Sequence, residues 1–142
     1  MKILEIDTLK RRIGNLGERL AAKHLRREGY KILEKNFVAD GYEIDIIAIK
    51  DNTVAFVEVK ARTVGAENPM EPRPASAVTK EKQQKIIKAA SYYRRRRHDS
   101  CRARFDIIEV YLEKTKTGRK AKEIKHLIGA FDLNTAYAGG KR

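Results

Sequence analysis

The sequence has little that would cross-link it covalently or anchor it in a lipid bilayer. Cys101 is the only cysteine, which excludes an internal disulfide and fits a reducing compartment. The longest apolar runs, such as residues 46–49, are four residues long, so no segment is expected to span a membrane. Residues 1–12 lack the apolar core and the cleavage site of a secretory signal. These absences predict a cytoplasmic protein.

Acidic and aromatic residues are also scarce relative to basic ones. Lys and Arg number 32 against 19 Asp and Glu, which leaves a net charge of +13, and aromatic residues make up only 7% of the chain. Such an excess is typical of a protein with a polyanionic partner, either nucleic acid or an anionic membrane surface. It also serves simple solubility, because charge does not specify a fold. We interpret it as favouring a nucleic acid over a membrane.

The chain length and the hydrophobic pattern predict one domain. A chain of 142 residues can bury its own core without disulfides or a structural metal. The pattern predicts helices over residues 8–28 and 79–97, and strands over residues 30–37, 43–50, 53–62, 104–112 and 123–131. The order αβββαββ predicts a mixed α/β sheet flanked by helices. Residues 63–75 are expected to form a mobile loop, and residues 134–142 a flexible basic tail after a domain over residues 1–133.

Two glycines interrupt the first predicted helix. Gly14 and Gly17 each cost about 1 kcal/mol relative to alanine in a helix interior. They either permit the helix to pack closely on the sheet or indicate that the helix begins later than residue 8.

The two central β-rich runs carry the densest group of candidate functional residues. Residues 51–52 (Asp-Asn) separate these runs and predict a two-residue hairpin turn. This turn places Asp45 directly opposite Glu58, and Glu43 opposite Lys60, all on one face of the sheet. Like charges that face each other destabilise a sheet, so neighbouring residues neutralise the carboxylates or a cation binds them. A turn of three or five residues would shift this pairing by one residue.

Paired carboxylates on neighbouring strands suit a divalent cation. We expect Mg²⁺ or Mn²⁺ with Asp45, Glu58 and the carbonyl of Val59 as ligands. A metal ion held in this way lowers the pKa of a bound water and stabilises charge on a phosphate. Lys60 is placed to orient or deprotonate that water or to contact the phosphate, and Glu18 can contribute from the first helix. The alternative is an ordinary strand pair whose basic neighbours neutralise the carboxylates.

The second predicted helix presents a basic surface. Its lysines and arginines can contact phosphates, and each such contact adds salt dependence to binding. The candidate nucleic-acid-binding residues are Arg62, Lys80, Lys82, Lys85, Lys88, Arg94, Arg95, Arg96 and Arg97. Any one of them is also explained as part of a solvated helix whose last arginines complement the helix dipole. Tyr92 and Tyr93 are candidates for stacking on bases, although at least one of them is expected in the core.

These residues resemble a known family. An acidic residue on one strand and Glu-x-Lys on the next, after a helix that bears Glu, resembles the PD-(D/E)xK nuclease core. More closely, the sequence resembles the YraN-like family of uncharacterised bacterial proteins. The matching blocks lie between residues 14 and 131 and are Asn15-Leu16-Gly17-Glu18, Gly29-Tyr30, Glu43-Ile44-Asp45, residues 56–62, Val78 with Lys82, Ala89-Ala90 and Arg104-Phe105-Asp106. The family usually has Gly directly before Glu-Ile-Asp, where this chain has Tyr42.

The resemblance implies a restriction endonuclease-like fold, similar to that of Holliday-junction resolvases. It implies a Mg²⁺- or Mn²⁺-dependent endonuclease that acts on DNA, branched or structured forms included. The catalytic residues would be Glu18, Asp45, Glu58 and Lys60. A homodimer is one candidate assembly, because two symmetric cuts need two sites. Two alternatives stay open: a catalytically inactive nucleic-acid-binding module with the same fold, and a basic partner for another protein in which the carboxylates are purely structural.

Overall fold

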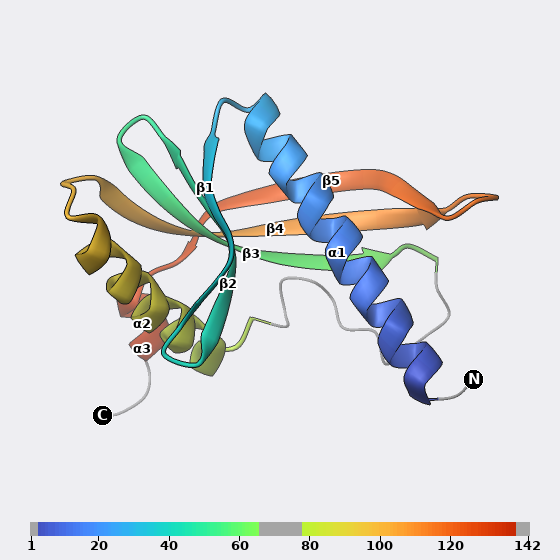
Figure 1. Cartoon of the computed structure of the whole chain (residues 1–142), viewed down its shortest axis with the longest axis horizontal. Coiled ribbons are helices and arrows are strands. Elements are labelled where there is room, and N and C mark those ends of the chain that lie inside the picture. The colour runs from blue at the N-terminus through green and yellow to red at the C-terminus, as the bar shows by residue number, and fades with distance from the viewer. Residues whose placement is uncertain (1–2, 66–77, 139–142) are drawn as a thin grey trace.

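The structure, a computed structural model, describes residues 3–65 and 78–138 (Figure 1). The elements in chain order are α1 (Ile3–Arg27), β1 (Lys31–Ala39), β2 (Tyr42–Lys50), β3 (Thr53–Thr63), α2 (Lys80–Arg97), β4 (Arg102–Lys114), β5 (Arg119–Phe131) and α3 (Leu133–Tyr137). The predicted order αβββαββ is confirmed, with the short helix α3 added at its end. None of the described helices is both long and apolar enough to cross a membrane.

The strands form one mixed sheet in the order β1-β2-β3-β4-β5. Neighbouring strands are antiparallel except β3 and β4, which run parallel. Parallel neighbours need a crossover connection, and here α2 lies between them in the chain. Long β4 and β5 project beyond the rest of the sheet as a two-stranded arm (Figure 1). This arrangement is consistent with the restriction endonuclease-like core that the sequence resembles.

The core consists of two apolar layers, one on each face of the sheet. On one face, α1 crosses the middle of the sheet and contributes Ala21, Ala22 and Leu25 (Figure 1). On the other face, α2 packs over β1 and β2 and contributes Ile86 and Ala90. The central strands β2, β3 and β4 have buried runs between these layers, which explains the β-branched runs that predicted them, whereas the edge strands β1 and β5 are mostly exposed.

Helix α1 is longer than predicted and lies close to the sheet. It begins at Ile3 instead of residue 8, so Gly14 and Gly17 are both interior helical positions. A Cβ atom at Gly17 would lie 2.6 Å from Cβ of Ala61 on β3, whereas a Cβ at Gly14 would meet nothing within 4 Å. Only Gly17 therefore permits the close packing that the sequence suggested.

The predicted turn between β2 and β3 is confirmed. Asp51 and Asn52 both have positive φ angles, 49° and 60°, as a two-residue turn of type I′ requires. The paired residues then run from Lys50 with Thr53 to Ile46 with Val57, in the register that the sequence predicted.

The C-terminal segment differs from the flexible tail predicted to begin at residue 134. Asp132 caps α3 by accepting a hydrogen bond from the amide of Thr135 at 2.9 Å. Gln84 of α2 donates a hydrogen bond to the carbonyl of Ala136, whose side chain is buried. A cap and a docking contact thus order residues that look like a loop in sequence. The rest of that tail, residues 139–142, and residues 66–75 of the predicted mobile loop lie outside the described residues.

Candidate functional site

Strands β2 and β3 separate next to the acidic residues. Their backbone pairing ends at Ile46 and Val57, one position short of the predicted pair of Asp45 with Glu58. Beyond that point, Oδ2 of Asp45 accepts a hydrogen bond from the backbone amide of Val59 at 2.7 Å. The carboxylate takes the place of the carbonyl that would otherwise continue the ladder. Asp45 therefore reaches across the gap between the strands instead of standing opposite Glu58.

The side-chain alternation of β2 also breaks at Asp45. Ile44 and Ile47 pack in the layer that contains α2, whereas Ile46 packs in the layer that contains α1. On the neighbouring strand β1, Asn36 has a positive φ of 54°. The residues before and after Asn36 pair with the residues after and before Asp45. The prediction that the four charged residues share one face of the sheet is therefore wrong along β2. An irregularity in both strands changes the direction of the side chains at this point.

Glu58 is nearly buried, with 7% of its surface exposed. Its Oε2 atom lies 3.4 Å from Nζ of Lys60 and accepts a hydrogen bond from the hydroxyl of Tyr42 at 3.3 Å. Among the described residues, its Oε1 atom has no hydrogen-bond partner. A buried carboxylate oxygen without a partner is costly, so a ligand that satisfies Oε1 is favoured here.

Burial dominates the electrostatics of the acidic pair. Burial raises the pKa of Asp45 to about 8, and the charges of Glu58 and Glu18 add to this rise, against the hydrogen bond from Val59. Burial also raises the pKa of Glu58, against the opposing effect of Lys60. Asp45 thus favours its protonated form at neutral pH, and a cation near the two carboxylates would stabilise their charged forms.

Glu18 approaches this pair from α1. Its Oε1 atom accepts a hydrogen bond from Nδ2 of Asn36 at 2.9 Å, so β1 holds its side chain in place. Its charge contributes to the raised pKa of Asp45, which places the two carboxylates within electrostatic range. The structure therefore brings all four predicted catalytic residues into one region, from α1, β2 and β3.

The donor atoms present fit an open magnesium or manganese site. In a strand, the N–H and the C=O of one residue point to the same side. The amide of Val59 points to Asp45, so its carbonyl also faces the gap between β2 and β3. Within residues 3–65 and 78–138, no three His, Cys, Asp or Glu side chains are arranged to enclose a metal ion. Two carboxylates and a carbonyl still suffice for Mg²⁺, which keeps several of its waters.

Three residues near the site were not predicted to belong to it. Tyr42 holds Glu58, and it stands where the resembling family usually has Gly, which was the one available signal. Asn36 holds Glu18, and no sequence pattern marked it. Lys82 of α2 was expected only to bind nucleic acid, but it lies beside the acidic pair. The nearby charge of Lys60 lowers the pKa of Lys82, while Glu58 opposes this effect.

The other predicted nucleic-acid-binding residues divide into several groups. Lys80 donates a hydrogen bond to the carbonyl of Ala138, and Lys85 pairs with Glu81. Arg62 lies on β3 next to Tyr111 of β4.

The arginines at the end of α2 have separate partners. Arg94 donates a hydrogen bond to the carbonyl of Cys101, and Arg97 pairs with Asp99. Arg96 lines a pocket with Glu34 and Phe37. Lys88 and Arg95 line a separate surface pocket. The predicted basic surface is therefore not one uniform patch.

Known proteins resemble this chain over most of its length. The model of the uncharacterised protein family UPF0102 matches residues 17–110. A UPF0102 protein of Caldanaerobacter subterraneus subsp. tengcongensis is 43% identical over 123 residues, which are 86% of this chain and 96% of that protein. A UPF0102 protein of Geobacter metallireducens is 45% identical over 85% of this chain and 93% of its own length. The chain thus belongs to the UPF0102 family, the YraN-like family that its sequence blocks resemble.

Proposed function

We propose that this protein is a divalent-metal-dependent endonuclease that hydrolyses phosphodiester bonds in DNA, branched or structured DNA included. One observation carries the proposal. Where β2 and β3 separate, the buried carboxylate of Glu58 and the partly buried carboxylate of Asp45 lie in one region with the ammonium group of Lys60. Withdrawal from water raises the pKa values of both carboxylates and disfavours their charged forms, and such a pair near a lysine is a signal for catalysis.

The residues of the site have distinct roles in this proposal. Asp45, Glu58 and the carbonyl of Val59 would hold Mg²⁺ or Mn²⁺, which supplies an activated water and neutralises charge on the phosphate. Lys60 lies beside Glu58 and would orient the attacking water or stabilise the charge that develops on the phosphate. Glu18, held by Asn36, would orient water from the side of α1. Tyr42 restrains Glu58 through a hydrogen bond to Oε2.

The test compares cleavage and binding in matched variants. Purified protein is incubated with duplex, single-stranded and four-way-junction DNA in the presence of Mg²⁺ or Mn²⁺. We expect Asp45→Asn and Lys60→Ala to abolish cleavage while DNA affinity changes little. Glu43→Gln is the control, because Glu43 is an exposed acid on the same strand. If both site variants cut as well as the wild type, this site does not catalyse cleavage.

A second function is a nucleic-acid-binding module without turnover. The ion pair between Lys60 and Glu58 favours it, because a neutralised carboxylate needs no metal. The two functions are separated by measuring the melting temperature of the protein at increasing Mn²⁺ concentrations. A rise in melting temperature with Mn²⁺ that is lost in Glu58→Gln supports the nuclease. The binding module is supported if DNA binding depends on salt, the melting temperature does not rise with Mn²⁺, and no cleavage product forms.

A further inference from the structure

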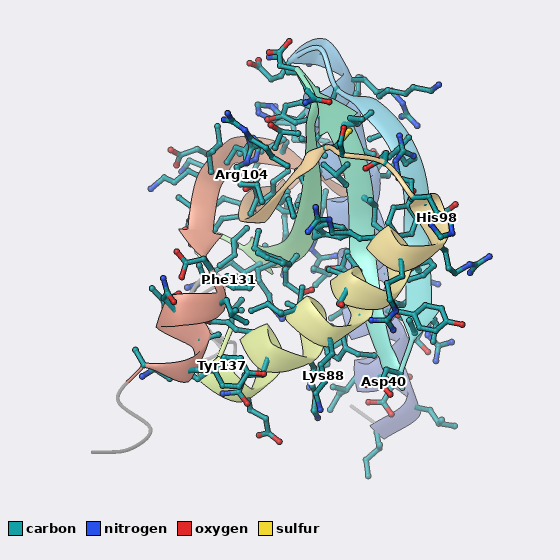
Figure 2. All side chains as sticks on the ribbon, turned by 90° about the vertical axis from the view of Figure 1, so that its left-hand side faces the viewer. Asp40, Lys88, His98, Arg104, Phe131 and Tyr137 are labelled. Atoms are coloured by element: carbon teal, nitrogen blue, oxygen red, sulfur yellow. The ribbon has the colours of Figure 1, made fainter. Side chains whose placement is uncertain are left out.

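A surface pocket of about 350 Å³ lies on the outer side of α2, away from the acidic pair. Asp40, in the turn between β1 and β2, closes one side of it. Lys88, Ser91, Tyr92 and Arg95 of α2 form the rest of its lining. Figure 2 shows Asp40 and Lys88 next to each other at this side of the helix. The volume is within the range of small-ligand sites, about 300 to 1,000 Å³.

The two adjacent tyrosines of α2 have opposite environments. Tyr93 is half-buried and packs edge-on against the rings of Phe37 and Phe56, so it belongs to the core. Tyr92 is 44% exposed and lines the pocket. An exposed aromatic ring offers a planar surface on which a nucleic-acid base can stack. Of the two candidates for stacking, only Tyr92 is placed to do so.

Arginine and lysine lie beside that ring. The guanidinium carbon of Arg95 is 5.8 Å from the ring centroid of Tyr92, and Nη1 of Arg95 donates a hydrogen bond to Oγ of Ser91 at 3.1 Å. These contacts hold the guanidinium group in the pocket with its remaining N–H groups available as donors. Lys88 supplies a second positive charge in the same pocket. A phosphate is the ligand group that such a pair of cations favours.

Asp40 distinguishes this pocket from a simple anion site. A carboxylate repels a bare phosphate, but it accepts hydrogen bonds from the N–H groups on the edge of a base. Its positive φ of 54° fixes it in the turn between β1 and β2, over the helix. One pocket thus combines a stacking surface, two cations and an acceptor. A nucleotide has a complementary group for each of them.

We propose that this pocket binds one unpaired nucleotide, with its base on Tyr92 and its phosphate between Lys88 and Arg95. The proposal rests on the proposed function in that the ligand is a nucleic acid. Along α2, these residues lie about 9 to 20 Å from Lys82, which borders the acidic pair, at 1.5 Å per residue. The bound nucleotide is therefore a few nucleotides away from the cleaved bond. Substrates with a single-stranded segment beside that bond are favoured over continuous duplex.

The test measures binding without turnover. Fluorescence anisotropy with a labelled oligothymidylate of twelve nucleotides in EDTA gives affinities that do not depend on a metal or on cleavage. We expect Tyr92→Ala to weaken binding about tenfold and Tyr92→Phe to retain it, because phenylalanine still stacks. Tyr137→Ala is the matched control, since Tyr137 is 49% exposed on α3 and outside the pocket. Both tyrosines are exposed, so these variants are expected to fold.

An abasic strand of the same length identifies the group that is recognised. The wild type should bind it about tenfold more weakly than oligothymidylate, and Tyr92→Ala should bind both strands equally. If Lys88→Ala weakens binding while Tyr92→Ala and base removal do not, the pocket is a phosphate site and the proposal is wrong. If oligothymidylate does not bind, or an acidic peptide binds in its place, the proposal is also wrong. The cleavage assay with Mg²⁺ still decides the nuclease function independently.

Discussion

The backbone amide of Val59 donates a hydrogen bond to the carboxylate of Asp45 across the gap between β3 and β2, at 2.7 Å. This hydrogen bond takes the place of the next backbone hydrogen bond between β2 and β3, and it holds the partly buried side chain of Asp45 in position. It also turns the carbonyl of Val59 toward the same gap. The consequences for stability, packing and catalysis can each be measured.

Stability without divalent cations is expected to fall as the pH rises. The folded-state pKa of Asp45 is raised to about 8, whereas an unfolded aspartate titrates near 3.9. The native state therefore holds a proton that the unfolded state has lost, so this stabilisation is complete below pH of about 4 and is lost through pH of about 8. The slope for one proton is at most about 1.4 kcal/mol per pH unit.

Urea denaturation in EDTA between pH 5 and pH 8.5 measures this slope. Asp45→Asn cannot titrate, so the difference in unfolding free energy between it and the wild type should shift in favour of the variant as the pH rises. The difference in unfolding free energy between variant and wild type cancels the contributions of groups that both proteins share. Such groups include Asp106, whose pKa is shifted in the opposite direction. Parallel pH profiles would contradict the raised pKa of Asp45.

Gly17→Ala is expected to destabilise the fold by about 1–3 kcal/mol. The added Cβ would lie 2.6 Å from Cβ of Ala61, so α1 must move away from β3. Gly14→Ala is the matched control, because its Cβ meets nothing within 4 Å and alanine is the better helix former. Gly14→Ala should therefore stabilise the protein by up to about 1 kcal/mol. Thermal or urea unfolding that ranks the two variants equally would refute this packing argument.

Asp106→Asn is expected to cost about 3–5 kcal/mol of unfolding free energy. Asp106 is fully buried and accepts hydrogen bonds from Nε and Nη2 of Arg104 and from the amide of Gly129, and it contacts His126 at 2.8 Å. Burial raises its pKa, but these partners outweigh the effect and leave the pKa lowered. Removing its charge leaves the arginine without its counter-ion.

The control for the Asp106 variant is an exposed acid on the same hairpin. Glu123 pairs with Lys125 at 4.0 Å, and both side chains are half exposed. Glu123→Gln should change the free energy of unfolding by less than about 1 kcal/mol, because exposed ion pairs contribute little. Equal losses for the two variants in urea denaturation would show that burial does not decide the contribution of Asp106.

Lys82→Ala is expected to lower DNA cleavage at least about tenfold, through loss of a positive charge beside the acidic pair. Lys85→Ala, one turn away on the same helix, removes an exposed lysine that pairs with Glu81 at 3.9 Å. Lys85→Ala should alter only the salt dependence of binding. Single-turnover rates at saturating protein distinguish the two effects. Equal rates for the two variants would place Lys82 outside the site.

The hairpin shows how far local sequence information reaches. The Asp-Asn turn and the alternation of the flanking runs depend on neighbouring residues only, so they predicted the pairing of residues 46–50 with 53–57. They failed at Asp45, because a side chain competes there with the backbone carbonyl for the amide of Val59. Local patterns do not contain that competition. It depends on how β1, β2 and α1 pack around the same point.

The candidate site shows the same division. Pattern and resemblance together predicted Glu18, Asp45, Glu58 and Lys60 as site residues, and the fold brings these four residues into one region. The approach of Tyr42 and Lys82 was not predicted, because these residues reach the acidic pair through contacts between elements that are distant in the chain.

The sequence by itself determined the element order, the turn between β2 and β3 and the identity of the acidic residues, because these depend on local propensity and periodicity. Only the tertiary structure decided where the ladder ends, which polar side chains meet, and how strongly the carboxylates resist ionisation. Burial and long-range packing set those properties, and both arise only when α1 and α2 enclose the sheet.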